Sequence, residues 1–217
     1  MSRVVEGVLA GPALDTRELI LASASTAREA VLEHAGLSFH CEAAAVDESE
    51  VKSSLKGEHG ETYRGAVALA ETLAELKAVR ISRKSPEALV IGADQVLECD
   101  GKWFDKPDDT AAARATLLKL RGKSHRLISG VCVALDGECL WRHVDHATLL
   151  MRPFSDAFLD RYLDAVGARA LGSVGAYQVE GPGAQLFARI DGDYFTILGL
   201  PLLPLLEFLR GHGVVPA

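Results

Sequence analysis

Short apolar runs alternate with segments of helical periodicity along this chain, and no other feature constrains its fold as strongly. Residues 18–23 (ELILAS) predict a buried strand, and residues 25–35 predict a helix that buries Val31 and Leu32. Strands that alternate with helices indicate an α/β sheet covered by helices. Further strands are predicted at residues 38–46, 87–99, 124–135 and 139–151, and further helices at 62–82, 108–122, 155–167 and 200–211.

Two Asp-Gly pairs follow strand signals directly, with no helix in between. Asp100-Gly101 ends the strand predicted at 87–99, and Asp136-Gly137 joins the last two strand signals. Asp-Gly favours the tight turns that connect antiparallel strands. The pattern therefore predicts a mixed sheet, with parallel and antiparallel pairs, bent into two lobes.

The charge balance narrows the class of partner. The sequence carries 30 Asp and Glu residues against 23 Lys and Arg, a formal net charge of −7. A non-specific binder of nucleic acid or of an anionic membrane needs a basic excess, so the net charge argues against both partners. A local basic pocket in an acidic protein suits a small anion instead. The four cysteines show no CxxC spacing, which favours reduced thiols over a zinc site.

No segment divides the chain or directs it to a membrane. There is no internal repeat and no Pro/Gly-rich linker, so residues 1–217 are expected to form a single domain, with residues 1–17 as an N-terminal extension. The N-terminus makes a poor signal peptide, and prolines and Glu207 interrupt the apolar run at 196–209. A cytoplasmic protein is therefore expected.

The stretch LASASTAR ends the first strand signal and begins the first helix. Free amides at a helix N-terminus, with the Ser25 hydroxyl beside them, favour anion binding, and the Arg28 guanidinium can add a bidentate contact to phosphate. The same residues also fit a plain helix cap followed by a surface arginine. The local sequence leaves both interpretations open.

Carboxylates occur at two places where a protein core needs none. Asp94 interrupts an apolar strand directly after Gly92 and Ala93. A buried charge is costly unless it is paired, and small neighbours let a ligand approach the backbone, so Asp94 is predicted to function in a site. Asp47 and Glu48 follow the second strand signal, where they either bind a hard divalent cation or remain solvated loop acids.

Two lysines and a glycine-rich loop complete the set of candidates. Lys77 lies on the helix predicted at 62–82, and Lys106 precedes Pro107, which favours an extended backbone there. Both lysines can supply point charges for a polyphosphate, unless each is a solvated surface residue. The late loop around Glu180 is flanked by aromatic and apolar residues, which suit either a base pocket or ordinary turns.

Taken in order, these segments resemble the Maf family of nucleoside triphosphate pyrophosphatases over nearly the whole chain. LASASTAR is similar to the family's opening motif, VDESE to its acidic pair, LAELKA to its helix motif, and IGADQV and DKP to its central motifs. GAYQVEGPGA and RIDGDYFTILGLPL are similar to its C-terminal signatures. The matching functional positions are Ser25, Arg28, Asp47, Glu48, Lys77, Asp94 and Lys106.

The resemblance implies both a fold and a reaction. The fold is a mixed, strongly bent α/β sheet flanked by helices, with two lobes around a central cleft, as in inosine-triphosphatase-like proteins. The reaction is hydrolysis of the α–β phosphoanhydride of a nucleotide, which gives a monophosphate and pyrophosphate with Mg²⁺ or Mn²⁺ as cofactor. The family also implies a homodimer.

The resemblance further implies a role for each matching residue. Asp94 would accept a proton from the attacking water or orient that water. Glu48 would bind the metal together with Asp94. The phosphates would be held by Lys77, Lys106, Arg28 and Ser25.

Four positions depart from the commonest family pattern. Thr26 replaces a proline, and Ala27 stands where an arginine or an aromatic residue is common. Gln95 and Glu180 stand where pyrimidine-type members carry Thr and Gln; both resemble the branch that acts on 7-methyl-GTP, in which an acid suits a cationic, methylated purine. Ala27 lacks that branch's aromatic ring. Ala27, Gln95 and Glu180 are therefore predicted to set the base preference.

Two other functions remain open at the level of sequence. The family is associated with inhibition of septum formation, so a nucleotide-binding regulator with weak catalysis is one alternative, in which Thr26 and Ala27 would mark a degraded site. A related enzyme that acts on deaminated purine nucleotides shares the chemistry but lacks this order of motifs.

Overall fold

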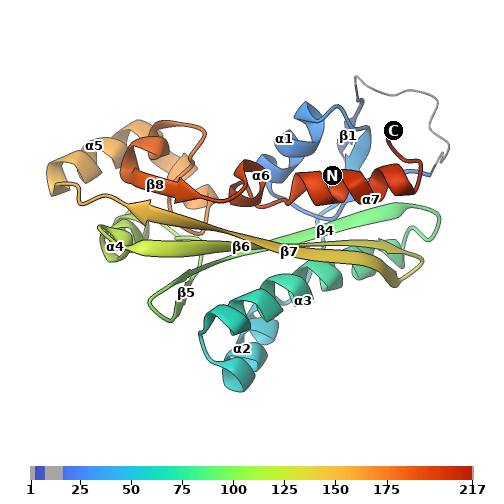
Figure 1. Cartoon of the computed structure of the whole chain (residues 1–217), viewed down its shortest axis with the longest axis horizontal. Coiled ribbons are helices and arrows are strands. Elements are labelled where there is room, and N and C mark those ends of the chain that lie inside the picture. Colours follow the sequence, from blue (N-terminus) through green and yellow to red (C-terminus); the bar gives the residue numbers. More distant parts are fainter. Residues whose placement is uncertain (1–2, 8–16, 217) are drawn as a thin grey trace.

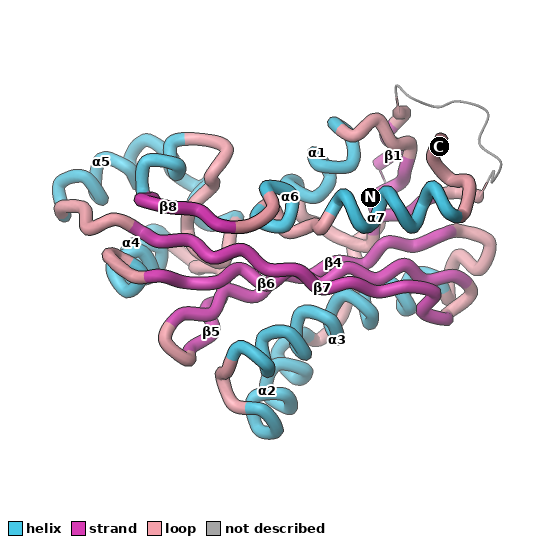
Figure 2. Tube along the Cα trace, viewed as in Figure 1, coloured by secondary structure: helices cyan, strands magenta, loops and turns pink. Residues whose placement is uncertain are grey.

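The computed structural model of the chain describes residues 3–7 and 17–216. Its strands are β1 (Arg3–Val5), β2 (Leu19–Leu21), β3 (Phe39–Cys41), β4 (Leu89–Cys99), β5 (Lys102–Phe104), β6 (Ser124–Leu135), β7 (Glu138–Met151) and β8 (Phe187–Asp191). In these described residues they form one eight-stranded sheet in the order β1-β3-β2-β4-β6-β7-β8, with β5 paired to β4. β2 runs parallel to β3 and β4, and the other pairs are antiparallel. β6 and β7 run along the middle of the molecule (Figure 2).

Helices cover both faces of this sheet. They are α1 (Thr26–His34), α2 (Glu48–His59), α3 (Tyr63–Ser82), α4 (Thr110–Leu120), α5 (Asp156–Val166), α6 (Tyr194–Ile197) and α7 (Leu202–Gly211). α3 lies against β4 and β6 on one face, with α2 beside it, whereas α1 and α7 lie on the other face (Figure 1). Short 3-10 helices span Gly167–Gly172 and Pro182–Leu186.

Two glycines let α3 approach the sheet closely. A Cβ atom at Gly92 would collide with the backbone of Ala74, and one at Gly130 would collide with the backbone of Ala70. The two alanines lie one helical turn apart on α3, and both are fully buried. α3 therefore rests almost backbone to backbone on β4 and β6. This contact determines where Lys77 meets the sheet.

On its face away from α3, strand β4 passes through two separate hydrophobic cores. Its first half, with Leu89 and Ile91, packs with α1 and α7, whereas its second half, with Leu97 and Cys99, packs with α4 and α5. We call these two regions the α7 lobe and the α5 lobe. Asp94 lies on β4 between them. The predicted mixed sheet, flanked by helices and divided into two lobes, is confirmed.

Both predicted Asp-Gly turns are present. Asp100 and Gly101 have φ angles of 52° and 72°, and Asp136 and Gly137 have φ angles of 49° and 79°. Positive φ at both central residues is the turn geometry whose twist matches that of the flanking strands. The turns connect β4 to β5 and β6 to β7, as expected.

Residues 38–61 differ from the prediction. The strand expected at 38–46 ends at Cys41, and the polar stretch after it forms helix α2 with Asp47 as its N-cap. α2 has no buried residue, so its sequence lacks the apolar periodicity that reveals a helix. Asp47 and Glu48 therefore mark the beginning of a helix, not the end of a strand.

The predicted N-terminal extension contributes to the sheet. Its residues 3–5 form β1, which pairs antiparallel with β3, whereas residues 1–2 and 8–16 lie outside the described residues. Within the described part of the chain, none of the helices combines the length and the apolar character needed to cross a bilayer.

Candidate active site

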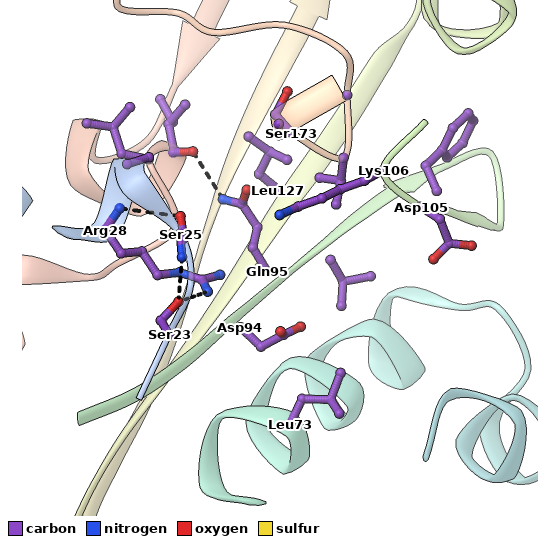
Figure 3. A pocket seen from close by; sticks show the side chains of 18 of the residues that line it. Ser23, Ser25, Arg28, Leu73, Asp94, Gln95, Asp105, Lys106, Leu127 and Ser173 are labelled. Atoms are coloured by element: carbon purple, nitrogen blue, oxygen red, sulfur yellow. Dashed lines mark hydrogen bonds between the residues drawn. The ribbon is translucent and has the colours of Figure 1, made fainter. Parts of the chain in front are cut away.

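A cavity of about 710 Å³ opens between the α7 lobe and the α5 lobe. It is bounded by the start of α1, by α2 and α3, by the middle of β4, by β5, and by the loop at residues 173–180. Figure 3 shows Asp94 and Gln95 near its centre, with Arg28 on one side and Lys106 on the other. The nine residues predicted from the sequence to act in catalysis, substrate binding or metal binding all line this cavity. Asp47, the other matching position of the family motifs, does not line it, and its side chain caps α2 instead.

Lys77 bridges two carboxylates at the inner end of the cavity. Its Nζ atom lies 2.5 Å from Asp94 Oδ1 and 2.6 Å from Glu48 Oε1. The side chains of Lys77 and Asp94 are 10% and 11% exposed, whereas that of Glu48 is 56% exposed. The close packing of α3 on β4 thus brings a buried ion pair to the cavity, and α2 adds a second, more open carboxylate.

Opposing effects act on the Asp94 carboxyl group. Burial raises its pKa, the positive charges of Lys77 and Arg28 oppose that rise, and the net direction is upward. A carboxylate with a raised pKa binds a proton more readily than an ordinary Asp, which suits a group that takes a proton from water. Shifts of this kind are typical of working sites.

The LASASTAR stretch serves both the helix and the cavity. Ser25 is the N-cap of α1, and its hydroxyl accepts a hydrogen bond from the Arg28 amide at 3.4 Å. The Arg28 guanidinium turns inward, where Nε donates to the Gly199 carbonyl at 2.8 Å and Nη1 donates to the Ala93 carbonyl at 2.9 Å. The helix cap is therefore present. The arginine, however, is buried at the cavity wall and does not lie on the surface.

Two more lysines line the cavity beside β5 and α2. Lys106 reaches into it (Figure 3), and within the described residues Lys106 forms no ion pair. Burial lowers the pKa of the Lys106 ammonium, and the charge of Arg28 lowers it further. Lys52, on α2, contacts both carboxylate oxygens of Asp105 at 2.5 and 2.7 Å. Lys52 was not predicted from the sequence, because α2, which places this lysine one turn from Glu48, was not predicted either.

The residues expected to set the base preference are held in different ways. Gln95 Nε2 donates to Ser129 Oγ at 2.9 Å and to two carbonyls of α6, each at 3.1 Å. The amide nitrogen is thus engaged by the protein, which leaves the amide oxygen for a ligand. Glu180 is exposed on the loop at residues 173–180, and Ala27 is half-buried on α1.

A buried pair behind this loop was not singled out from the sequence. Tyr177 lines the cavity, and its Oη atom lies 2.6 Å from His125 Nε2 on β6. Burial lowers the pKa of His125 to about 4, so the imidazole is neutral at pH 7. The two residues are 52 positions apart, and no local pattern links them.

This mixed sheet, with a buried carboxylate–lysine pair and further cations in the cavity between its lobes, defines an α/β protein with a site for a negatively charged ligand. A family model described as Maf-like protein matches residues 18–212. The chain belongs to this family, and the resemblance drawn from its motifs is confirmed.

Relatives with assigned names match most of the chain. It is 56% identical, over 89% of its length, to the nucleoside triphosphate pyrophosphatase of Paramagnetospirillum magneticum, of which 98% is covered. It is 54% identical, over 90% of its length, to the protein of that name from Granulibacter bethesdensis, of which 97% is covered. It is also 52% identical, over 90% of its length, to the 7-methyl-GTP pyrophosphatase of Brucella abortus, of which 96% is covered.

Proposed function

We propose that the protein hydrolyses nucleoside triphosphates between the α- and β-phosphates and releases a nucleoside monophosphate and pyrophosphate. The observation that carries this proposal is the gathering of Asp94, Lys77, Glu48 and Lys106 around one cavity. A triphosphate requires positive charge along its length, and an attacking water requires a base beside the phosphorus. The names of the relatives support the same reaction.

In this reaction Asp94 is the base. Its carboxylate takes a proton from a water molecule while the water oxygen bonds to the α-phosphorus and pyrophosphate leaves. The Lys77 ammonium holds the Asp94 carboxylate in position at 2.5 Å. Lys106 and Arg28 offset the negative charge that grows on the phosphate oxygens. Ser25 and the first amides of α1 hold a phosphate oxygen at the helix N-terminus.

The carboxylates of Glu48 and Asp94 also fit a divalent cation. They supply the oxygen ligands that Mg²⁺ and Mn²⁺ prefer, and because both contact Lys77 they lie close enough to share one ion. No group of three or more His, Cys, Asp or Glu side chains in the described residues is arranged for a metal, so water and phosphate oxygens would complete the coordination. The bound cation would neutralise phosphate charge.

We extend the proposal to a preference for 7-methyl-GTP. The name of the Brucella relative supports this substrate, as does the exposed carboxylate of Glu180 at the cavity. A carboxylate favours the positively charged ring of a 7-methylated guanine over a neutral guanine. Action as a homodimer is part of the same proposal and rests on the family resemblance. The cytoplasmic location expected from the sequence is proposed with it.

The test is to incubate the purified protein with a panel of nucleoside triphosphates, including 7-methyl-GTP, in Mg²⁺, Mn²⁺ or EDTA. Equal amounts of monophosphate and pyrophosphate are expected, and turnover should stop in EDTA. In ¹⁸O-labelled water the label should enter the monophosphate, because water attacks the α-phosphorus. Release of single phosphates, or no turnover of any triphosphate, would contradict the proposal.

A further inference from the structure

Helix α2 borders the cavity without a buried side chain of its own. Its apolar contacts come from half-buried residues that pack beside α3. Two ion pairs extend from its cavity side, from Glu48 to Lys77 and from Lys52 to Asp105. Glu48 and Lys52 are four residues apart and therefore share one face of the helix. The position of α2 is thus tied to charged groups that line the cavity.

The two ion pairs differ in how firmly each lysine is held. Lys77 is nearly buried and contacts two carboxylates, so a ligand can bind the Lys77 ammonium fully only if it replaces both of these contacts. Within the described residues the ion pair of Lys52 is with Asp105 alone, and the Asp105 side chain is 78% exposed. Water and salt compete with exposed ion pairs, which are weak for that reason. Lys52 is therefore much more easily transferred to a ligand than Lys77.

Protein groups already bind most of the other cationic side chains of the cavity, so a negatively charged ligand can use Lys52 as a further donor. Arg28 donates through Nε and Nη1 to protein acceptors, and the charge of Lys77 is balanced by two carboxylates. Lys106 extends into the cavity (Figure 3), and the neighbouring Asp105, which also lines the cavity, is paired with Lys52. A polyphosphate carries several negative charges, more than Lys106 and Arg28 together can balance. Lys52 lines the same cavity and can supply the next positive charge.

We propose that Lys52 is a further substrate-binding residue, which exchanges Asp105 for a phosphate oxygen when a polyphosphate enters the cavity. The inference rests on the proposed function, because it requires a polyphosphate ligand. The new contact is a charge-assisted hydrogen bond inside the cavity, which is stronger than an exposed ion pair. Asp105 returns to water at little cost. Because Glu48 lies one turn away, the exchange also draws α2 toward the bound phosphates.

Calorimetric titration of the whole protein with pyrophosphate and Mg²⁺ tests the exchange without any need for turnover. Lys52→Met is expected to weaken pyrophosphate binding about tenfold, and Lys52→Arg, which keeps the charge, should retain most of the affinity. Lys56→Met is the matched control, because Lys56 lies one turn further along α2, pairs with Glu61 and does not line the cavity. Equal affinity in Lys52→Met and wild type, or no binding by the wild type, overturns the proposal.

Asp105→Asn tests whether Lys52 binds phosphate or whether its ion pair with Asp105 only holds α2 in place. If Lys52 binds phosphate, removal of its competitor leaves pyrophosphate affinity equal to or higher than that of the wild type. If the ion pair merely holds α2 in place, Asp105→Asn and Lys52→Met weaken binding equally, and this result also overturns the proposal. Failure of the proposed function would look different, because the wild type would then bind pyrophosphate but turn over no triphosphate.

Discussion

Two walls of the cavity hold their side chains in different ways. On the first, which we call the helix–strand wall, Lys77 and Asp94 project from α3 and β4, and their ion pair is buried. The second, the loop wall at residues 173–180, contains neither strand nor helix. It is held from behind by the hydrogen bond between Tyr177 and His125. The first wall owes its geometry to packing of regular elements, and the second to individual hydrogen bonds.

The backbone of the loop wall also depends on individual hydrogen bonds. Ala176 has a φ angle of 58°, a left-handed conformation that costs energy for a residue with a side chain. Ser173 Oγ donates to the Tyr177 carbonyl at 2.6 Å and accepts from its amide at 3.0 Å, which closes the turn. The phosphates are common to all nucleotides, whereas the bases differ. We therefore expect changes in the helix–strand wall to alter the rate with every substrate, and changes in the loop wall to alter the choice of substrate.

The largest effect is expected for Asp94→Asn in the helix–strand wall. Asn has nearly the same shape but cannot accept the proton of the attacking water, so kcat should fall about a thousandfold for every triphosphate. Pyrophosphate release at saturating substrate measures the change. A melting temperature at or above that of the wild type is the control for folding. A variant that retains its rate would show that another group is the base.

Much of the helix–strand wall could be predicted from the sequence. A continuous apolar run identified β4, and Asp94 was recognisable because a charge within such a run is costly unless it has a function or a partner. The contact of Asp94 with Lys77, in contrast, depends on how closely α3 approaches the sheet. That distance is set by Gly92 and Gly130, whose effect requires knowledge of what lies opposite them.

Other parts of the site could not be predicted because their determinants are distant in the chain or lie on the surface. α2 has no buried residue, so no periodicity revealed it, and Lys52 was missed with it. Arg28 is held by the carbonyl of Gly199, 171 residues away. The partner of Tyr177 is His125, on a strand that the sequence predicted without any indication of this contact. Side-chain hydrogen bonds between distant segments leave no local pattern.

Glu180→Gln tests the loop wall, and its expected effect is on preference. Loss of the carboxylate should lower the ratio of kcat/KM for 7-methyl-GTP to that for GTP about tenfold, because the methylated base carries a positive charge and guanine does not. The rate with GTP itself should stay within about twofold of the wild type. Competition between the two nucleotides in one assay measures the ratio. If this ratio of kcat/KM values is unchanged, Glu180 does not recognise the base.

Lys106→Arg tests the positive charge on a third side of the cavity, with an effect of only about threefold at neutral pH. The pKa of Lys106 is lowered, so the lysine loses its charge at a lower pH than usual, and turnover that requires the charge falls as pH rises through that pKa. Arg keeps its charge to higher pH. The alkaline limb of kcat/KM, measured between about pH 7 and 10, should therefore move upward in the variant. If the alkaline limbs of Lys106→Arg and of the wild type coincide, a group other than Lys106 causes the loss of turnover at high pH.

The smallest effect on turnover is expected for His125→Gln, within about twofold at pH 7.5, because Gln can still hydrogen-bond to Tyr177. Its effect appears in stability. Burial lowers the pKa of His125 from 6.5 to about 4, so between these values the unfolded chain binds more protons and the folded state loses stability as pH falls. At pH 5 the loss from this group is about 2 kcal/mol. Between pH 7.5 and 5 the free energy of unfolding, measured with urea, should therefore fall by about 2 kcal/mol less in His125→Gln than in the wild type. Equal losses would mean that His125 is protonated in the folded protein, and the loop wall would then be held by a charged group.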